Sequence, residues 1–283
     1  MSLRLPVLTV LSLVAFAANS LLCRAALAQG AIDAATFTTV RLASGAIVLG
    51  AIAWYRAAGT KPRNGDWMSA LALFAYALGF SYAYMQLPAA TGALLLFGAV
   101  QATMIGSGLA KGERLHAWQV VGLVLACAGL VGLLLPGLTA PPLAGAMLML
   151  LAGIAWGIYS LRGRGATSAL ATTAGNFLRA VPMALLASVF LVQDAHADAA
   201  GIGCAILSGA LASGVGYAIW YAVLPALKAT SAATLQLCVP VLAAIGGLAF
   251  LHEAPTLRLV VASIAVLGGI ALVILSRPRR VAT

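Results

Sequence analysis

Residues 67–110 contain no charged side chain, and this run constrains the fold more than any other feature of the chain. About 20 apolar residues cross a bilayer as a helix, so the run is too long for one crossing, and Pro88 is its natural break. Apolar runs divided in this way predict ten spans: residues 5–23, 34–55, 67–86, 88–110, 116–135, 142–161, 171–192, 200–222, 229–250 and 256–275. The runs are continuous rather than alternating, which favours helices over barrel strands.

The composition excludes most classes of soluble protein. Hydrophobic residues make up 63% of the chain and charged residues 8%, whereas soluble domains are about 45–50% apolar and about 25% charged. Such a chain cannot coat a water-facing surface, which excludes a soluble enzyme, a nucleic-acid-binding protein and a disordered scaffold. The four cysteines lie in apolar stretches without paired spacing, so we expect neither a disulfide framework nor a metal site.

Lys and Arg are unevenly distributed over the predicted connections. With the N-terminus in the cytoplasm, twelve basic residues fall on the cytoplasmic side, and only Arg24 and Arg258 fall outside. Because cytoplasmic loops carry the excess of Lys and Arg, we predict a multi-pass protein of the cell's inner membrane with both termini cytoplasmic. The net charge of +10 then belongs to the cytoplasmic rim, and no nucleic-acid partner is expected.

The two parts of the chain resemble each other. Arg24 and Arg162 are 138 positions apart, as are Arg41 and Arg179. The repeat divides the chain into residues 1–138 and 139–283, with five helices each, and an odd number of helices inverts the second half relative to the first. Inverted repeats are an architecture of secondary transporters, although duplication alone could also build a helical bundle. The repeat also requires the first helix, so we expect Ala26-Leu27-Ala28 not to act as a signal cleavage site.

A glutamate follows the fourth helix of each half. The segment "MIGSGLAKGERLHAWQVVGLVLACAGLVGLLL" aligns with "AIGGLAFLHEAPTLRLVVASIAVLGGIALVIL", which pairs Glu113 with Glu253. With the arginine early in each second helix, this pattern resembles the drug/metabolite transporter superfamily, specifically the ten-helix EamA-type exporters. The resemblance implies a basket-like bundle whose cavity is lined by the first four helices of each half, and it points to exporters of amino acids, including aromatic ones. Val239-Pro240 departs from the repeat, because the fourth helix has no equivalent proline.

Charged residues are scarce within the predicted spans. None of the six acidic residues lies in the middle of a span, which disfavours a proton relay at membrane depth and makes facilitated diffusion the simpler mechanism. Arg41 and Arg179 are the only charges well inside spans, and they either contact the substrate or a gate, or hold the helices together. Glu113 and Glu253 follow helix ends and are expected to cap the helices that come next in the chain.

Aromatic and amide side chains recur on helices that the resemblance assigns to the cavity, and Tyr76, Phe80 and Tyr84 form a stripe at the helical spacing i, i+4, i+8. Such stripes also occur in helix packing and in interfacial belts, and buried amides also join helices, so both readings stay open. A cavity built from these residues is aromatic and largely neutral, which suits a zwitterion or a neutral solute with an apolar side chain. The candidate substrate-binding residues are Asn19, Tyr76, Phe80, Tyr84, Gln101, Trp156, Tyr159, Asn176, Tyr217, Trp220 and Tyr221.

The sequence offers no constellation for covalent chemistry. The three histidines fall at separate helix ends or loops, so no catalytic residue, metal site or cofactor is expected, which disfavours a membrane-embedded enzyme. We therefore predict a secondary transporter that exports small metabolites, in particular amino acids, by alternating access, acting as a monomer or homodimer in the lipid bilayer. The alternatives are a multidrug or metabolite exporter driven by a proton gradient, and a structural subunit without a substrate.

Overall fold

The computed structural model describes residues 4–56, 64–137, 139–164, 166–191, 195–227 and 229–276, and long helices dominate these ranges. Within them, the only β pairing is an isolated antiparallel bridge between Ile32 and Ala197. The first half holds α1 (Arg4–Ala28), α2 (Ala34–Arg56), α3 (Trp67–Tyr84), α4 (Ala89–Ala110) and α5 (Ala117–Leu134). The second half holds α6 (Leu143–Arg162), α7 (Ala169–Phe190), α8 (Ala199–Ile206), η2 (Leu207–Val215), α9 (Gly216–Val223), η3 (Leu224–Ala226), α10 (Ala229–Gln236), α11 (Cys238–Leu251) and α12 (Leu257–Leu275).

These helices confirm the prediction of an all-α membrane protein. Among the described residues, nine helical segments are long and apolar enough to cross a membrane, counting α8 to η3 as one segment and α10 with α11 as another. The tenth, α3, has 18 residues, as many as α5, and its tyrosines and tryptophan make it less apolar. Each predicted span therefore corresponds to a long helical segment.

Helix boundaries follow local capping chemistry. The side chains of Asp66, Ser168, Asp198 and Thr256 accept hydrogen bonds from backbone N–H groups in the first turns of α3, α7, α8 and α12. Such N-caps satisfy donors that have no partner within the helix. Pro88 and Pro142 stand immediately before α4 and α6, so the predicted break at Pro88 is confirmed.

Two crossings are less regular than the sequence predicted. The eighth crossing contains the π-helical segment η2, and the side chain of Asn19 on α1 bonds to both Ser208 and Ser213 of this segment. The ninth crossing divides at Leu237 into α10 and α11. Pro240 lacks an N–H for the carbonyl of Gln236, which is the bond that would have continued the helix. The α1 helix also runs beyond the predicted end of the first span, to Ala28.

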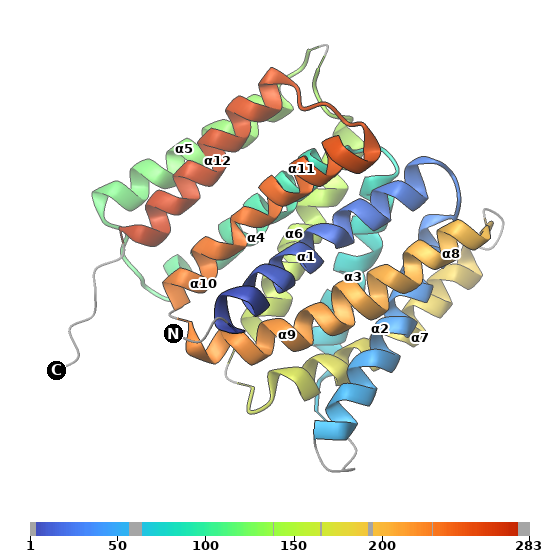
Figure 1. Ribbon diagram of the computed structural model, residues 1–283. Helices are drawn as coiled ribbons and strands as arrows, with labels where there is room; N and C mark the ends of the chain where they lie inside the picture. Colours follow the sequence, from blue (N-terminus) through green and yellow to red (C-terminus); the bar gives the residue numbers. More distant parts are fainter. Residues whose placement is uncertain are drawn as a thin grey trace.

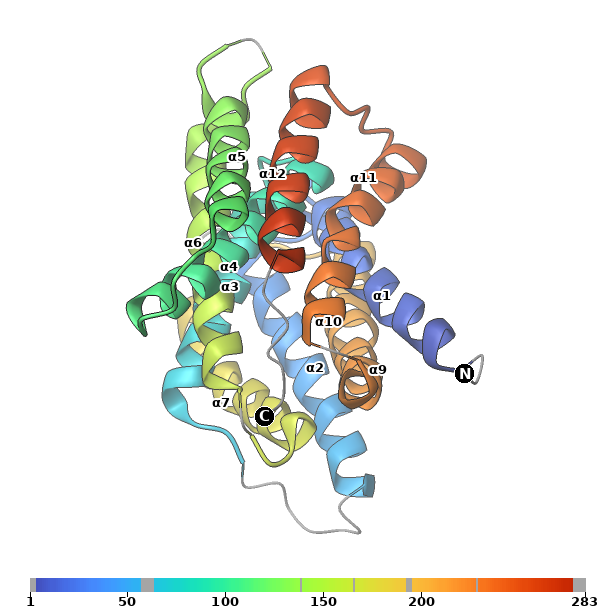
Figure 2. The ribbon, with the colours of Figure 1, turned by 90° about the vertical axis from the view of Figure 1, so that its left-hand side faces the viewer.

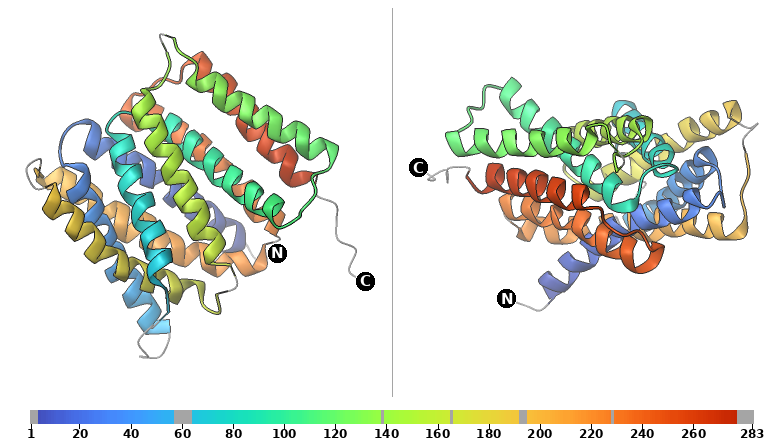
Figure 3. Two further views of the ribbon diagram at one scale, coloured as in Figure 1. Left: turned by 180° about the vertical axis from the view of Figure 1, so that it is seen from behind. Right: turned by 90° about the horizontal axis from the view of Figure 1, so that it is seen from above.

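The helices form two layers, which are seen edge-on in the right view of Figure 3. Figure 1 shows the near layer in the order α12, α11 with α10, α1, α9 with α8, and α2. The view from behind in Figure 3 shows the other layer in the order α5, α4, α6, α3 and α7. Contacts between layers join α5 to α12, α4 to α11, and α2 to α7. Each layer therefore contains helices from both halves of the chain.

The α5 and α12 helices lie side by side at one edge of the bundle, apart from α2 and α7 (Figures 1 and 2). Gly122 on α5 and Gly269 on α12 meet backbone to backbone, and a Cβ on either glycine would collide with the other helix. Small residues at such a crossing let helices approach closely in a membrane. This pair is peripheral to the bundle.

Several basic residues used for the orientation lie outside the described residues. They are Lys61, Arg63, Lys228, Arg277, Arg279 and Arg280. The orientation in the membrane therefore stays a prediction from the sequence.

Candidate functional site

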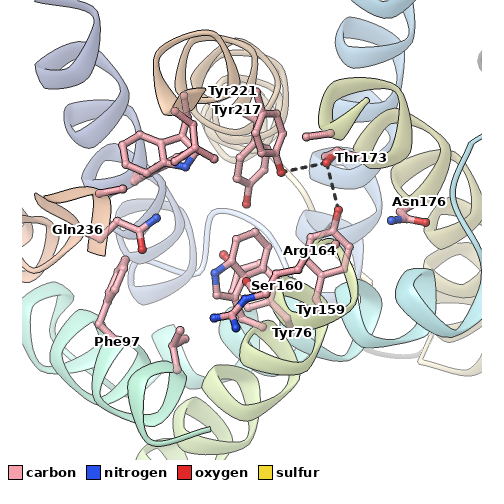
Figure 4. Close-up of a pocket in the computed structure, with 18 of the residues that line it drawn as sticks. Tyr76, Phe97, Tyr159, Ser160, Arg164, Thr173, Asn176, Tyr217, Tyr221 and Gln236 are labelled. Atoms are coloured by element: carbon pink, nitrogen blue, oxygen red, sulfur yellow. Dashed lines mark hydrogen bonds between the residues drawn. The ribbon is translucent and has the colours of Figure 1, made fainter. Parts of the chain in front are cut away.

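A cavity of about 480 Å³ lies between the two layers, where α1, α3, α4, α6, α7, α9 and α10 face one another (Figure 4). This volume is within the range of about 300–1,000 Å³ that is usual for small-molecule sites. The α2 helix contributes no lining residue, although the resemblance implied a wall from the first four helices of each half. The α5 and α12 helices are absent from the wall, as the peripheral position of this pair requires.

Aromatic rings form one side of the cavity. Trp156 stacks on Tyr159 and Tyr217, with ring centroids 5.2 and 5.6 Å apart, and packs against Tyr76 at 4.7 Å. Tyr217 in turn stacks on Tyr221 at 6.1 Å. These rings come from α3, α6 and α9, so they join helices of both halves around a single space.

Polar groups interrupt the aromatic wall at Thr173, Asn19 and Asn176. The hydroxyl of Thr173 on α7 lies 3.0 Å from that of Tyr221 and accepts a longer bond of 3.4 Å from Tyr159, which Figure 4 shows as dashed lines. Asn19 lies deeper, where its amide is engaged by the two serines of η2. Asn176 accepts a bond from the backbone N–H of Asp66 at 2.9 Å. The wall can therefore offer hydroxyl and amide groups to a ligand.

The structure brings nine of the eleven candidate residues to this cavity. They are Asn19, Tyr76, Phe80, Trp156, Tyr159, Asn176, Tyr217, Trp220 and Tyr221. Tyr84 and Gln101 are not in the wall. Tyr84 is fully buried and donates to the carbonyl of Ala89, whereas Gln101 faces α5 and α12 beside a small separate pocket. The helical stripe that joined Tyr84 to Tyr76 and Phe80 continues past the closed end of the cavity.

Other lining residues were not predicted from the sequence. Phe16 contacts Tyr217 and Trp220, and Phe97 and Gln236 lie across the cavity from the aromatic rings (Figure 4). Phe97 lies in an apolar run with no pattern to distinguish it from a packing residue. Gln236 carried a signal, because it is a polar side chain inside an apolar span.

The two intramembrane arginines have different surroundings. Arg41 is 2% exposed, packs behind Tyr76 and Phe80, and donates from Nη2 to the hydroxyl of Tyr76 at 2.9 Å. Arg179 is half-buried, and its Nη1 donates to the carbonyls of Asn64 and Gly175. Neither arginine is in the cavity wall, where the one charged residue among those described is Arg164, at the rim.

Glu253 closes one end of the bundle, which we call the latch end. The Oε1 atom of Glu253 accepts from Nε of Arg24 at 2.8 Å, and its Oε2 atom accepts from the backbone N–H of Ala89 at 2.7 Å. Arg24 also donates to the carbonyls of Tyr84 and Met85. The expected cap on the following helix is wrong for Glu253, because its carboxylate caps α4 and Thr256 caps α12.

Glu113 occupies the corresponding turn after α4. Its backbone N–H donates to the carbonyl of Gly108, as that of Glu253 donates to Gly247. The carboxylate of Glu113 lies over Gly108. The next helix, α5, begins instead with a capping box in which His116 and Gln119 bond reciprocally.

The α1–α2 and α7–α8 connections are also joined at the latch end. Backbone bonds link Asp33 to His196 and Asp198 to Ala31. The side chain of Asp33 accepts from the N–H groups of Thr36 and His196. Partial burial opposes the charge of Asp33, but the hydrogen bonds from Thr36 and His196 outweigh this effect and lower the pKa of the carboxyl group.

The opposite end of the bundle, which we call the open end, carries a different ion pair. Arg162 donates from Nη2 to Asp66 at 2.8 Å and from Nε to Ser69 at 3.0 Å. The hydrogen bonds from Ser69, together with the Arg162 guanidinium, lower the pKa of Asp66 to about 2. Exposed Gly163 and Arg164 form part of the cavity rim at this end. The cavity therefore runs from this rim to a floor of buried residues around Asn19 and Phe80.

No cluster of three or more potential metal ligands occurs among the described residues. The cysteines there are unpaired.

One family model matches both halves of the chain. The sequence matches the EamA-like transporter family over residues 5–135 and again over residues 143–275. It is 54% identical over 275 residues to the uncharacterized protein PA1977 of Pseudomonas aeruginosa, covering 97% of this chain and 96% of that protein. A crystal structure of a protein with 20% sequence identity superposes with a TM-score of 0.67 over 96% of this chain and 98% of the other. At that identity, the superposition supports the fold alone.

Proposed function

Because the chain belongs to the EamA-like transporter family, we propose that it exports amino acids with apolar or aromatic side chains by alternating access. Membership makes the protein a membrane transporter of small compounds rather than an enzyme. The choice of amino acids as substrates rests on one observation, which is the chemistry of the cavity wall.

The wall combines stacked aromatic rings with hydroxyl and amide groups. Trp156, Tyr159 and Tyr217 offer flat apolar surfaces, and Thr173 and Asn19 offer hydrogen-bonding groups. No carboxylate lines the wall in the described part of the chain, which disfavours a cationic drug as the substrate. An amino acid with an apolar side chain uses both kinds of surface, because its side chain stacks while its polar groups form hydrogen bonds.

Reciprocal packing supports an inverted repeat with halves at residues 1–138 and 139–283. The α6 helix packs on α3 and α4, and α1 packs correspondingly on α9 and α11. The α2 helix packs on η2, and α7 packs correspondingly on α3. When the halves exchange conformations, such a bundle converts from open at one end to open at the other, which is alternating access.

An exporter receives its solute on the cytoplasmic side, and in the proposed orientation the open end faces the cytoplasm. The excess of Lys and Arg supports this orientation, with the protein in the inner membrane and both termini cytoplasmic. The structure then corresponds to an inward-open state that can receive a solute from the cell. A monomer contains a complete cavity, and a homodimer is equally compatible with the proposal.

Counterflow in proteoliposomes tests the proposal. Vesicles are preloaded with unlabelled amino acids, and uptake of labelled Thr, Met and Phe is followed without a proton gradient. We expect uptake of Met and Phe, and a reduction of about tenfold or more in Trp156→Ala, because truncating a central aromatic contact removes much of a ligand's binding energy. The matched control is Trp118→Ala, since Trp118 is 66% exposed on α5 and far from the wall.

Two outcomes would count against this function. If folded wild-type protein takes up none of the three amino acids, either without a proton gradient or with one imposed, the proposed substrate class is excluded. Uptake that appears only with an imposed proton gradient would support the proton-driven exporter instead of facilitated diffusion.

A further inference from the structure

Arg41 is a charged side chain without a charged partner. Of its guanidinium nitrogens, Nε and Nη1 have no hydrogen-bond partner in the described residues, and both are fully buried. The ion pairs in that part of the chain are Arg24 with Glu253 and Arg162 with Asp66, so neither carboxylate serves Arg41. Arginine does not deprotonate in proteins. The fold therefore keeps a positive charge beneath the cavity, and two of its three guanidinium nitrogens have no hydrogen-bond partner in the described residues.

The position of Arg41 makes this charge costly. The residue lies two turns into α2, about 10 Å from the start of the helix by its rise per residue. The guanidinium carbon lies 5.3 Å from the centre of the Tyr76 ring and 4.8 Å from that of Phe80. These cation–π contacts offset part of the desolvation, but they do not satisfy the N–H donors. An intramembrane charge of this kind is by default a functional site.

The geometry points to one ligand. We propose that Arg41 binds the carboxylate of the transported molecule, and that Tyr76 turns aside to admit this group. The inference rests on the proposed function and specifies which part of the substrate the protein recognises. Arg41 would then be the residue that separates carboxylate-bearing solutes from amines of the same shape.

The free donors suit a carboxylate. The Nη2 atom uses one of its two hydrogens on Tyr76, so one edge of the guanidinium keeps a pair of parallel N–H groups. Such a pair matches the two oxygens of a carboxylate, and bonds to a charged acceptor are about twice as strong as bonds to a neutral one. The Tyr76 hydroxyl is a neutral acceptor, so a substrate carboxylate can displace it.

Tyr76 and Phe80 separate Arg41 from the cavity, and Tyr76 is the one of the two that bonds to the guanidinium. The same side chain lines the cavity, accepts from Arg41 and packs on Trp156. A change of the Tyr76 rotamer would open the wall at the point where the guanidinium lies behind it. The apolar part of a bound solute would stay among the rings of Trp156 and Tyr217.

Calorimetric titration of the purified full-length protein in detergent tests the assignment. The probes are 3-phenylpropionate, L-phenylalanine and phenethylamine, which share a phenyl ring and of which only the first two carry a carboxylate. We expect the wild type to bind both carboxylates. Its dissociation constant for phenethylamine should be higher by about 30-fold or more, because loss of a buried charge pair has an effect of this size. Arg41→Gln should abolish this preference.

Two further variants keep the test decisive. Arg179→Gln is the matched control, because Arg179 occupies the equivalent sequence position but donates to backbone carbonyls near the surface. This variant should keep the preference for carboxylates. Arg41→Lys retains the charge but loses the fork of donors, so we expect a partial loss, and this variant serves if Arg41→Gln does not elute as a folded protein.

The possible results separate the two proposals. A wild type without preference for carboxylates, or a preference that survives in Arg41→Gln or is undiminished in Arg41→Lys, would overturn the role of Arg41. Wild-type counterflow of amino acids alongside such a result would leave the proposed function intact. Conversely, binding of carboxylates that depends on Arg41, without counterflow of any amino acid, would retain the site and exclude the amino-acid substrate.

Discussion

The two ends of the bundle carry similar ion pairs but connect different helices. At the latch end, Glu253 joins Arg24 in one layer to the first residue of α4 in the other. At the open end, Arg162 and Asp66 lie on α6 and at the start of α3, which are neighbours in the same layer. The first pair therefore holds the layers together, whereas the second pair leaves the space between them open.

Burial follows the same division. The side chains of Arg24 and Glu253 are 19% and 18% exposed, whereas those of Arg162 and Asp66 are 43% and 49% exposed. A charge in a partly buried pair depends on its partner more than a charge in a solvated pair does, because an unpaired charge away from water is costly. The comparison teaches that an ion pair holds the two layers together only where it joins one layer to the other.

The largest effect is expected from Glu253→Gln. This change removes the charge that pairs with Arg24 and weakens the bond from the N–H of Ala89, so the layers should separate at the latch end. The probe is a cysteine placed at Leu87, which is 0% exposed. We expect it to react with a membrane-impermeant maleimide about tenfold faster or more in the Glu253→Gln background than with Glu253 present, because loss of one partner of a partly buried pair is strongly destabilising.

The matched control for the latch is Asp66→Asn in the same cysteine background. This variant breaks an ion pair within one layer, so the labelling rate should not change. Equal acceleration by both variants would show that the two ends do not differ in the way their contacts indicate.

An intermediate effect is expected from Asp33→Ala. The Asp33 carboxylate accepts from Thr36 and His196 and so joins the start of α2 to the α7–α8 connection. Loss of such a cap costs about 1 kcal/mol, and the melting temperature should fall by a few degrees. Thermal unfolding of wild type and variant measures the change, and an unchanged melting temperature would contradict a joining role for Asp33.

The smallest effect is expected at the open end and depends on pH. Because the pKa of Asp66 is lowered to about 2 from an ordinary value of 3.8, its stabilisation is complete above about pH 4 and is lost as pH falls towards 2. The difference in melting temperature between wild type and Asp66→Asn should therefore be small and constant from pH 8 to 5, and shrink below about pH 4. A difference that changes between pH 5 and 8 would require another titrating group.

The sequence predicted the crossings because hydrophobicity is a property of local segments. Pro88 and Pro142 marked helix starts for the same reason, since proline restricts the backbone wherever it stands. Nine of the eleven candidate substrate-binding residues line the cavity. Their aromatic or amide character, on helices that the family resemblance assigns to the cavity, singled them out, although the same criterion also selected Tyr84 and Gln101.

Other features depend on contacts between distant segments. The helical stripe placed Tyr84 with Tyr76, but the cavity ends at a floor around Asn19 and Phe80. Tyr84 lies beyond this floor, where its carbonyl accepts from Arg24 on α1. The segment η2 is π-helical, and two of its serines bond to Asn19 on α1. No local sequence pattern could indicate these contacts, because the two segments are far apart in the chain.

By itself, the sequence determined the number of crossings, the family and the aromatic character of the site, because each depends on which residues follow one another along the chain. Only the tertiary structure decided which of two equivalent arginines is buried without a charged partner, and which end of the bundle is closed. Arg41 and Arg179 occupy matching positions in the repeat, yet one packs beneath Tyr76 and the other reaches backbone carbonyls near the surface. Burial and pairing are properties of neighbours in space, and the repeat in the sequence does not determine those neighbours.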